Sequence, residues 1–450
     1  MESTIKTSYI ILGGLLLLSS CAQEDSPAVR TDGSDRRIVF HTALPELTTK
    51  AKEIATELPY FLMTAFDESD VKLISGDTLK GYFYNKRIEK IDGSNTYQTD
   101  ECQWPAQGQE SDILHFFAYY PALGPGATLV NATAVGENNT IEAIGYNIKD
   151  FSVASDVAEQ VDFVTAYAKG SMAENLFSGI SLNFRHQLSR IEVKAKGAHK
   201  SCDIQIAGVR IANAGMKGDF VFPTSADADE VWSGTTKGIA EYIFHDGDPI
   251  VKVGPDAVSI MGKKIGEDTD NCAMLIPSTY SGWDYSGDSG NENEGMYMSV
   301  LLRVLDKTPG GNNKQQYPYP DNSQSLNAPN ISTVYLAVNK TNDIVTRRVY
   351  KSGESFFSDE ACTQSYTIPE EEEVRAFGWA SLPITGEWES GYTYTYTLDY
   401  TSGVGVHGPE VTGETSPKAG DPIIGDRVGV SVAVSNWQSG STTDETVPGS

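Results

Sequence analysis

The sequence from Tyr392 to Tyr400 reads YTYTYTLDY, and the sequence from Val428 to Trp437 reads VGVSVAVSNW. In both stretches large apolar residues alternate with small or polar ones. Successive side chains of a β-strand point to opposite faces of a sheet, so a period of two predicts strands with one buried face. An amphipathic helix would need a period near 3.6 residues.

Many other short stretches share this strand-like character and end at Gly, Pro, Asn or Asp. They are residues 37–42, 60–66, 114–120, 181–194, 204–211, 297–305 and 334–338. The only appreciable helical stretch is short, from Lys50 to Leu58. The chain carries no visible repeat of the length that propellers or solenoids require. We therefore predict an all-β sandwich architecture, with Phe116, Phe117, Phe184 and Leu188 in its core.

The composition limits the function. The 450 residues include 34 Lys and Arg against 61 Asp and Glu, a formal net charge of −27. A surface this negative repels phosphate backbones and anionic lipid headgroups, so we expect no nucleic-acid partner. The 22 Tyr, 16 Phe and 6 Trp supply enough large apolar surface for a folded chain.

The N-terminus predicts an export signal. Lys6 precedes an apolar run from Tyr9 to Leu18, which is too short to span a bilayer as a helix. The run ends in Leu-Ser-Ser-Cys21, which resembles the lipobox of bacterial lipoproteins, where the Cys is lipidated and becomes the mature N-terminus. We predict a signal peptide over residues 1–20, a lipid anchor on Cys21, and a flexible tether over residues 21–36.

The domain division is predicted from a composition shift. Residues 169–179 are rich in Gly, Ser, Ala, Glu and Asn and separate two strand-rich regions. We predict an N-terminal β-sandwich domain over residues 37–175 and a C-terminal β-sandwich domain over residues 179–438. Residues 439–450 form a polar tail.

The remaining cysteines are widely spaced and lie at positions 102, 202, 272 and 362. No C-x-x-C pair is present, and the acidic clusters lack the spacing of a calcium loop, so we predict no metal site. Three disulfide pairings of Cys102, Cys202, Cys272 and Cys362 are open, and buried free thiols are equally compatible with the sequence.

Catalysis is not expected, and neither is a cofactor. The tetrapeptide Gly287 to Gly290 matches a short serine-protease motif, but it lies in a polar loop without a strand context. His115 and His186 lie beside Phe residues in predicted strands and are interpreted as core or interface residues.

Aromatic residues in loop-like segments raise a rival function. They are Trp283, Tyr285, Tyr317, Tyr319 and Trp388. Exposed aromatic faces stack on sugar rings, so the alternative is a surface glycan-binding lipoprotein of a polysaccharide-uptake system.

The order of several short segments resembles the fimbrillin-like lipoproteins over nearly the whole mature chain. These segments are Ile38 to Phe40, Lys50-Ala51, Trp104-Pro105, Leu114 to Pro121, Leu182 to Leu188, Met274 to Pro277, Trp388 with Gly391, Tyr392 and Tyr394, and Val432, Val434 and Trp437. The resemblance implies two transthyretin-like β-sandwich domains in a surface-exposed lipoprotein of the cell outer membrane. It also implies a structural role in adhesion, as a subunit of a fimbrium of the type V kind.

The same resemblance implies assembly by strand exchange. A trypsin-like protease would cut a loop after the first strand, and a strand from another fimbrial subunit would fill the vacated place. The candidate processing residues are Lys50 and Lys52, which follow the first strand, and Arg36 and Arg37, which precede it. We expect that strand to form one edge of its sheet, with Ile38 and Phe40 covering the core.

The end of the chain departs from the pattern of polymerising subunits, which add an alternating apolar strand after the last domain. Here Trp437 is followed by residues that are polar apart from Val447 and Pro448. Residues 428–434 could themselves be the donor strand, but we favour a tip or accessory subunit that accepts a strand without donating one. A host or bacterial surface molecule would be its ligand, of a kind that the sequence does not identify.

Overall fold

The computed structural model describes residues 35–43, 58–68, 82–131, 134–135, 141–224, 231–263, 269–285, 294–318, 334–341, 345–411, 417–437 and 442–443. These residues form an almost purely β structure, which confirms the predicted all-β fold. The helices are the single-turn α1 (Met172–Asn175) and the 3-10 helix η3 (Val157–Glu159). Over the described ranges, no helix is long and apolar enough to cross a membrane.

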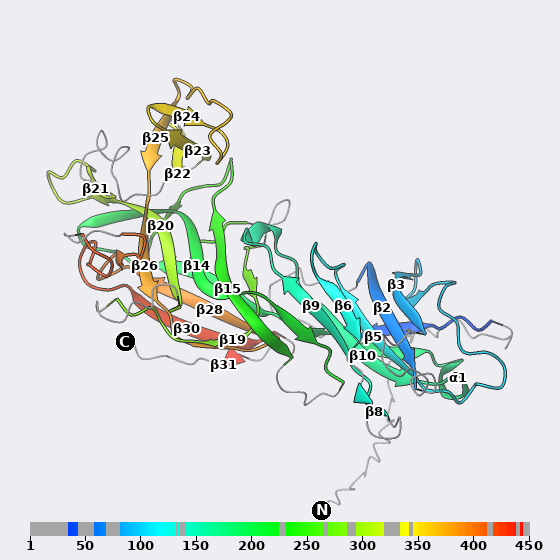
Figure 1. The fold of residues 1–450 in the computed structure, drawn as a ribbon. Helices are drawn as coiled ribbons and strands as arrows, with labels where there is room; N and C mark the ends of the chain where they lie inside the picture. The colour runs from blue at the N-terminus through cyan, green and yellow to red at the C-terminus, as the bar shows by residue number, and fades with distance from the viewer. Residues whose placement is uncertain are drawn as a thin grey trace, which may run out of the picture.

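Eight strands form the first sheet, drawn mainly in blue and cyan in Figure 1. In spatial order they are β11 (Ile180–Asn183), β1 (Phe40–Ala43), β4 (Thr96–Gln98), β3 (Phe83–Lys90), β2 (Tyr60–Asp67), β5 (Leu114–Tyr120), β10 (Val164–Gly170) and β12 (Arg185–His186).

A short bent segment joins the two ends of this sheet. β11 pairs with β1 at one end, whereas β12, two residues later in the chain, pairs with β10 at the other end. Phe184 lies between β11 and β12 and is 1% exposed. The sheet therefore rolls around one apolar core, to which Phe116 also belongs.

Two further sheets face each other, and most of their strands come from the second half of the chain. One contains β17 (Val258–Ser259), β13 (Ser189–Lys196), β28 (Tyr392–Asp399), β30 (Gly429–Asn436) and β31 (Thr442–Thr443), with β18 (Ala273–Leu275) also on β13. The other contains β29 (Val406–His407), β26 (Gly378–Pro383), β20 (Tyr297–Asp306), β14 (Cys202–Val221), β9 (Tyr146–Ser152) and β6 (Thr128–Asn131). β15 (Trp232–Ile243) and β16 (Val251–Lys252) join it on β14, and β21 (Gln315–Tyr317) joins it on β20.

The predicted alternation places the core between these two sheets. Tyr394, Tyr396 and Leu398 of β28 are buried against the inward residues of β14 and β20. Their Thr neighbours Thr395 and Thr397 remain half-exposed. A β-sandwich core built from alternate residues of facing strands is the result.

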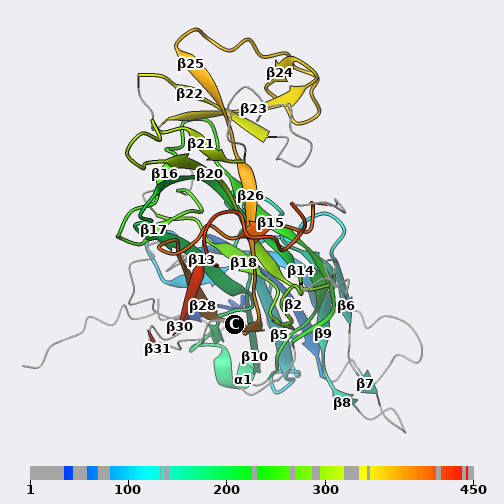
Figure 2. The ribbon, with the colours of Figure 1, turned by 90° about the vertical axis from the view of Figure 1, so that its left-hand side faces the viewer.

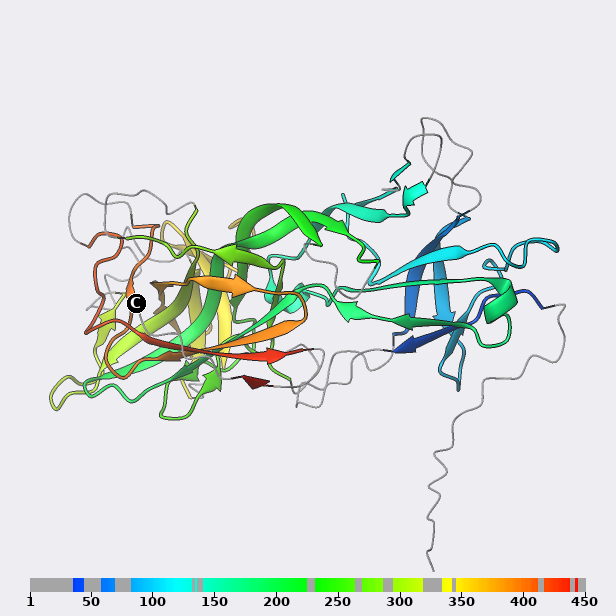
Figure 3. The same ribbon diagram turned by 90° about the horizontal axis from the view of Figure 1, so that it is seen from below.

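β14 connects the two regions of the molecule. Its first part pairs with β20, and its last part pairs with β9. Phe220, near the end of β14, and Phe222 just after it pack with Phe117 of β5 in one aromatic cluster. Figure 3 shows the resulting two lobes, with β14 reaching from one toward the other.

A smaller sheet rises from the second lobe (Figures 1 and 2). It contains β24 (Ser355–Phe357), β23 (Thr346–Ser352), β22 (Val334–Asn339) and β25 (Glu372–Ala376). Leu336 and Val338 of β22 pack on Leu301 of β20, while Tyr335 and Ala337 belong to a separate small core. Two strand pairs complete the structure: β19 (Ser278–Tyr280) with β27 (Gly386–Trp388), and β7 (Ala134–Val135) with β8 (Ile141–Ala143).

Strand pairing crosses the predicted domain boundary in both directions. β6 and β9 precede residue 175 but pair into the sheet of β14, whereas β11 and β12 follow residue 179 but belong to the first sheet. The division at residues 175–179 therefore stays a prediction about the chain, and sheet membership follows other limits. The proposed helix over residues 50–58 lies, apart from Leu58, outside the described residues.

The four predicted core residues are confirmed: Phe116, Phe117, Phe184 and Leu188 are each at most 1% exposed. Phe117→Ala should lower the free energy of unfolding by about 3 to 5 kcal/mol, because the lost ring leaves a cavity among aromatic neighbours. Chemical denaturation followed by circular dichroism measures this. The matched control is Phe177→Ala, since Phe177 is 66% exposed. Equal effects of the two substitutions would contradict the role of Phe117 in joining the lobes.

Candidate subunit interface

β1 lies inside the first sheet. It pairs in parallel with β11, where Phe40 faces Ile180, and antiparallel with β4, where Phe40 faces Tyr97. The expectation that this strand forms an edge is therefore wrong. An edge strand has one partner, whereas β1 has a strand on each side.

Backbone hydrogen bonds tie β1 and the residues before it to both neighbours. The Ile38 N–H donates to the Cys102 carbonyl oxygen at 2.9 Å, and the Ile180 N–H donates to the Val39 carbonyl oxygen at 2.8 Å. At the end of the strand the Phe184 N–H donates to the Ala43 carbonyl oxygen at 2.9 Å. If β1 were absent, donors and acceptors on both walls would lose their partners. We call the space that β1 occupies between β11 and β4 the β1 slot.

The inward side chains of this segment fill the core of the first sheet. Ile38 and Phe40 are fully buried, as predicted. The Phe40 ring packs edge-on against Phe61 at 5.9 Å and against Phe116 at 5.6 Å between ring centroids. His41 and Thr42 are half-buried. The floor of the β1 slot is thus apolar and aromatic.

One glycine allows the chain after α1 to pass close over β1. Gly179 has φ of +71°, and a Cβ atom at this position would lie 2.8 Å from the Val39 carbonyl oxygen and 2.9 Å from the His41 ring. A side chain at position 179 would therefore push β11 away from β1.

Arg36 and Arg37 lie in a backbone pairing at the entrance to β1. Arg36 exchanges two contacts with Trp104: its Nη2 donates to the Trp104 carbonyl oxygen at 2.8 Å, and its own carbonyl oxygen accepts from the Trp104 N–H at 2.8 Å. The Arg37 guanidinium pairs with Asp35 at 2.7 Å and Asp100 at 3.1 Å. Hydrogen bonds to these carboxylates raise the pKa of Arg37. Cleavage at either Arg would require this pairing to open.

The other candidate residues of processing and anchoring lie outside the described residues. They are Lys50 and Lys52, between β1 and β2, and Cys21 near the N-terminus. The whole serine-protease-like tetrapeptide, Gly287 to Gly290, also lies outside them. Their roles remain predictions from the sequence.

A buried histidine links the first sheet to the end of β30. The His186 ring stacks on Trp437 with ring centroids 3.9 Å apart and an interplanar angle of 6°. Its Nδ1 lies 2.7 Å from a carboxylate oxygen of Asp162. The backbone N–H of Trp437 donates to the Gly391 carbonyl oxygen at 2.7 Å. The interpretation of His186 as a core or interface residue is confirmed, and β30 ends in a buried anchor.

His115 is also a core residue, at 8% exposed. Its Nδ1 lies 2.8 Å from the Tyr167 hydroxyl. Burial lowers the pKa of His115, and the carboxylate of Glu68 partly offsets this effect. The ring is therefore neutral in the folded protein at neutral pH.

The described cysteines are all free thiols, which settles the open alternative against disulfides among these four residues. Cys102 and Cys202 are buried, and Cys272 and Cys362 are half-buried. Burial raises the pKa of Cys102 to about 12, so this thiol is unreactive at neutral pH. The parts of the chain that the structure describes also contain no group of three His, Cys, Asp or Glu side chains arranged to hold a metal ion.

Most aromatic residues of the rival glycan-binding hypothesis are buried. Trp283, Tyr317 and Trp388 are 4%, 6% and 1% exposed, so the expectation that they are exposed in loops is wrong. The Tyr317 hydroxyl donates to the Trp379 carbonyl oxygen, and the Trp388 Nε1–H donates to the Tyr396 hydroxyl. These contacts give the rings structural partners. Tyr319 lies outside the described residues.

Comparison with known proteins identifies the family. A family described as fimbrillin-like matches residues 64–349, well over half of the chain, and the chain belongs to this family. No curated protein matches the chain.

Solved structures similar to the chain include three from Bacteroides species. A fimbrial protein from Bacteroides vulgatus is 13% identical, with 90% of this chain and 100% of that chain covered and a TM-score of 0.46. A proposed cell adhesion protein from Bacteroides ovatus is 14% identical, with 89% and 98% covered and a TM-score of 0.36. One from Bacteroides eggerthii is 12% identical, with 89% and 96% covered and a TM-score of 0.37.

Sequence reasoning missed two features of this region. The parallel pairing of β1 with β11 joins residues about 140 positions apart, and the Trp437 stack joins residues about 250 apart. Local periodicity carries no signal of such partners. The sequence indicates that Ile38, Phe40 and Trp437 are apolar and need to be buried, but it does not indicate which residues bury them.

The pKa of His115 generates a test in pH. Its folded value lies below the ordinary value of about 6.5, so the unfolded chain binds the proton more readily. The contribution of His115 to the free energy of unfolding is therefore complete above about pH 6.5. It is lost as the pH falls through the pKa that His115 has in the folded protein. His115→Gln should therefore flatten the fall in unfolding free energy between about pH 7 and pH 5.

Burial also lowers the pKa of His407. His407→Gln is the control, because it should flatten the pH dependence of the unfolding free energy independently of His115→Gln. Denaturant titrations at several pH values measure both effects. An unchanged slope in His115→Gln would show that this ring is not buried in its neutral form.

Proposed function

We propose that this chain is a surface-exposed lipoprotein of the outer membrane that serves as a pilus subunit in cell adhesion. Family membership supports the fimbrial role. The names of similar structures, a fimbrial protein and proposed cell adhesion proteins, agree with it. The proposed role is structural, in keeping with membership of the fimbrillin-like family.

The environment of β1 is the observation that carries this proposal. We infer that proteolysis between β1 and β2 releases β1 together with the lipid anchor, and that a strand of another subunit enters the β1 slot. An incoming strand would gain backbone partners on two sides and an apolar floor formed by Phe61 and Phe116. A slot between two strands specifies register more strongly than a single free edge does.

We further propose that the subunit accepts a strand without donating one, as a tip or accessory subunit would. β30 is the last long strand of the described residues. Directly after it, the Trp437 ring stacks on the buried His186 ring. Leaving the sandwich would expose Val430, Val432 and Val434, which pack against the core. This cost supports β30 as a permanent part of the subunit.

Processing can be tested with charge-neutral variants. Lys50→Gln/Lys52→Gln should leave a folded protein that stays uncut and does not assemble, because β1 remains in place. Intact-mass analysis of protein shed from the cell surface, together with size-exclusion chromatography, reports cleavage and assembly. The control is Arg36→Gln/Arg37→Gln, which should still be cut after β1.

Assembly of the Lys50→Gln/Lys52→Gln protein at the unmodified level would reject strand exchange in the β1 slot. The glycan-binding lipoprotein would then be the stronger reading, and binding of polysaccharides to the uncut monomer would be the next measurement.

Anchoring is tested separately at Cys21. Cys21→Ser should abolish lipidation, so the protein should leave the outer-membrane fraction after cell fractionation. Metabolic labelling with a fatty-acid analogue should mark the unmodified protein and not the variant. Membrane partitioning that is unaffected by Cys21→Ser would contradict a lipid anchor at this residue, whatever the outcome at Lys50 and Lys52.

A further inference from the structure

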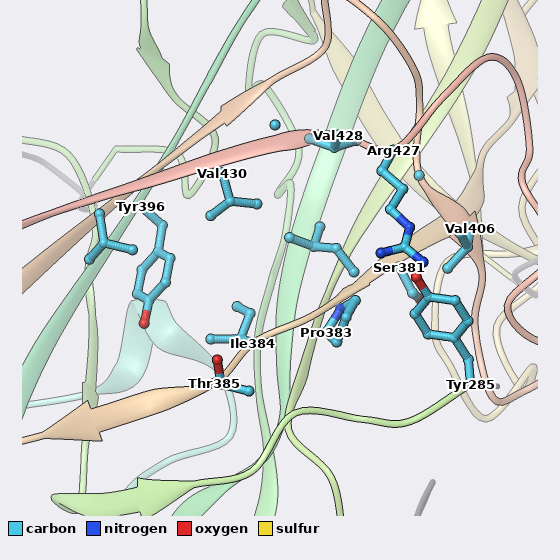
Figure 4. Close-up of a pocket in the computed structure, with 14 residues that line it drawn as sticks. Tyr285, Ser381, Pro383, Ile384, Thr385, Tyr396, Val406, Arg427, Val428 and Val430 are labelled. Atoms are coloured by element: carbon cyan, nitrogen blue, oxygen red, sulfur yellow. The ribbon is translucent and has the colours of Figure 1, made fainter. Parts of the chain in front are cut away.

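A largely apolar cavity of about 340 Å³ opens between the two facing sheets of the second lobe. Val428, Val430 and Val432 of the β30 segment line one side, and Pro383 and Ile384 at the end of β26 line the other (Figure 4). An engineered apolar cavity of about 150 Å³ holds a benzene molecule, so this cavity has room for an aliphatic chain of about ten carbon atoms.

The mouth of the cavity carries a cation. Arg427 lines the cavity and is exposed to solvent, and its guanidinium carbon lies 5.3 Å from the centroid of the half-buried Tyr285 ring. Contact with an aromatic face stabilises a cation. None of the described residues that line the cavity is Asp or Glu. Although the chain as a whole has a net charge of −27, the lining is therefore positive and favours an anionic ligand group at the mouth.

A buried hydrogen-bond donor lies on the other side of the cavity. Figure 4 shows Tyr396 across the cavity from Arg427. Tyr396 is 3% exposed, and its hydroxyl oxygen accepts from the Trp388 Nε1–H at 2.9 Å. Burial raises the pKa of Tyr396 to about 12, so the hydroxyl keeps its hydrogen at neutral pH.

The hydroxyl of Tyr396 can donate one hydrogen bond in addition to the one that it accepts. Within the described part of the chain, no residue accepts this hydrogen. A buried donor without an acceptor is unfavourable, so the inner part of the cavity favours a ligand that brings an oxygen atom.

We propose that this cavity binds a medium-chain aliphatic carboxylate that carries a hydroxyl or carbonyl oxygen on the inner part of its chain. The carboxylate lies at the mouth beside Arg427, the methylene groups pack against Val428, Val430 and Val432, and the inner oxygen accepts from Tyr396. A guanidinium matches the geometry of a carboxylate and its single negative charge, whereas a phosphate monoester carries nearly two charges.

This inference concerns the second lobe, and it does not depend on strand exchange in the β1 slot. Its experiment therefore has an outcome of its own, whatever the variants of Lys50 and Lys52 show.

Calorimetric titration of the full chain tests the site. The Cys21→Ser background removes the proposed lipid anchor, so the protein needs no detergent that would compete for the cavity. Decanoate should bind at one molecule per chain and more tightly than decanol, which has the same apolar body without the charge. Its affinity should fall with rising salt, because the ion pair at the mouth is exposed. A decanoate with a terminal hydroxyl group should bind more tightly still, because it brings an acceptor for Tyr396.

Substitutions separate the two ends of the cavity. Arg427→Gln should weaken decanoate binding by up to about fivefold, the effect of an exposed ion pair, and should leave decanol binding unchanged. Arg87→Gln is the matched control, because this arginine of the first lobe also lies over an aromatic ring, that of Tyr60 at 3.4 Å. It removes the same charge and should leave decanoate binding unchanged. Tyr396→Phe should abolish the advantage of the hydroxylated decanoate over decanoate.

A filling substitution locates the ligand. Val430→Phe places a larger side chain at a half-buried position of the lining and should abolish binding of all three probes, while the melting temperature reports that the variant is folded. Absence of decanoate binding to the chain with an unaltered cavity would overturn the proposal. Equal effects of Arg427→Gln and Arg87→Gln, or full binding by folded Val430→Phe, would overturn it as well, because the ligand would then lie elsewhere.

Discussion

The long strand β14 is the element on which the rest of the structure depends. Its 20 residues run through the second lobe and on to the first. A strand this long must satisfy its backbone groups against several partners, and it does so with β20, β15, β16 and β9. Register shifts between Ala212 and Ala214 and beyond let the strand bend between these partners. Phe220 and Phe222 then bring its end into the aromatic cluster of Phe117.

This continuity explains how the two lobes can respond differently to change. The first lobe is a rolled sheet in which β1 can be exchanged only if both neighbours and the aromatic floor accept a substitute. Such an exchange breaks and remakes bonds on two sides, so it should be slow and hard to reverse once complete. The second lobe is secured by a buried stack at the end of β30 and by a core between two sheets. Under the proposed strand exchange, the first lobe would receive the partner strand and the second lobe would keep its structure.

The sequence predicts the local parts of this architecture well. The alternation of Tyr394, Tyr396 and Leu398 correctly identified a strand with one buried face, because that pattern depends only on neighbouring residues. The same reasoning misplaced Trp283 and Trp388, because the burial of a ring depends on distant segments that cover it. It also assigned β1 to an edge, since nothing in residues 37–42 encodes a parallel partner at Ile180. Candidate core residues were therefore found, whereas their partners were not.

The small sheet of β22 to β25 has a different consequence. It is inserted between β20 with β21 and β26, and β20 and β26 are themselves paired side by side. Its two connections therefore leave from one place on the sandwich, and Leu336 and Val338 fix it there with one face of a single strand. An insertion with adjacent ends can change in length, charge or shape while the supporting sheet keeps its register. Substitutions or length changes in this insertion can thus alter the protein surface that it forms without changing the sandwich that supports it.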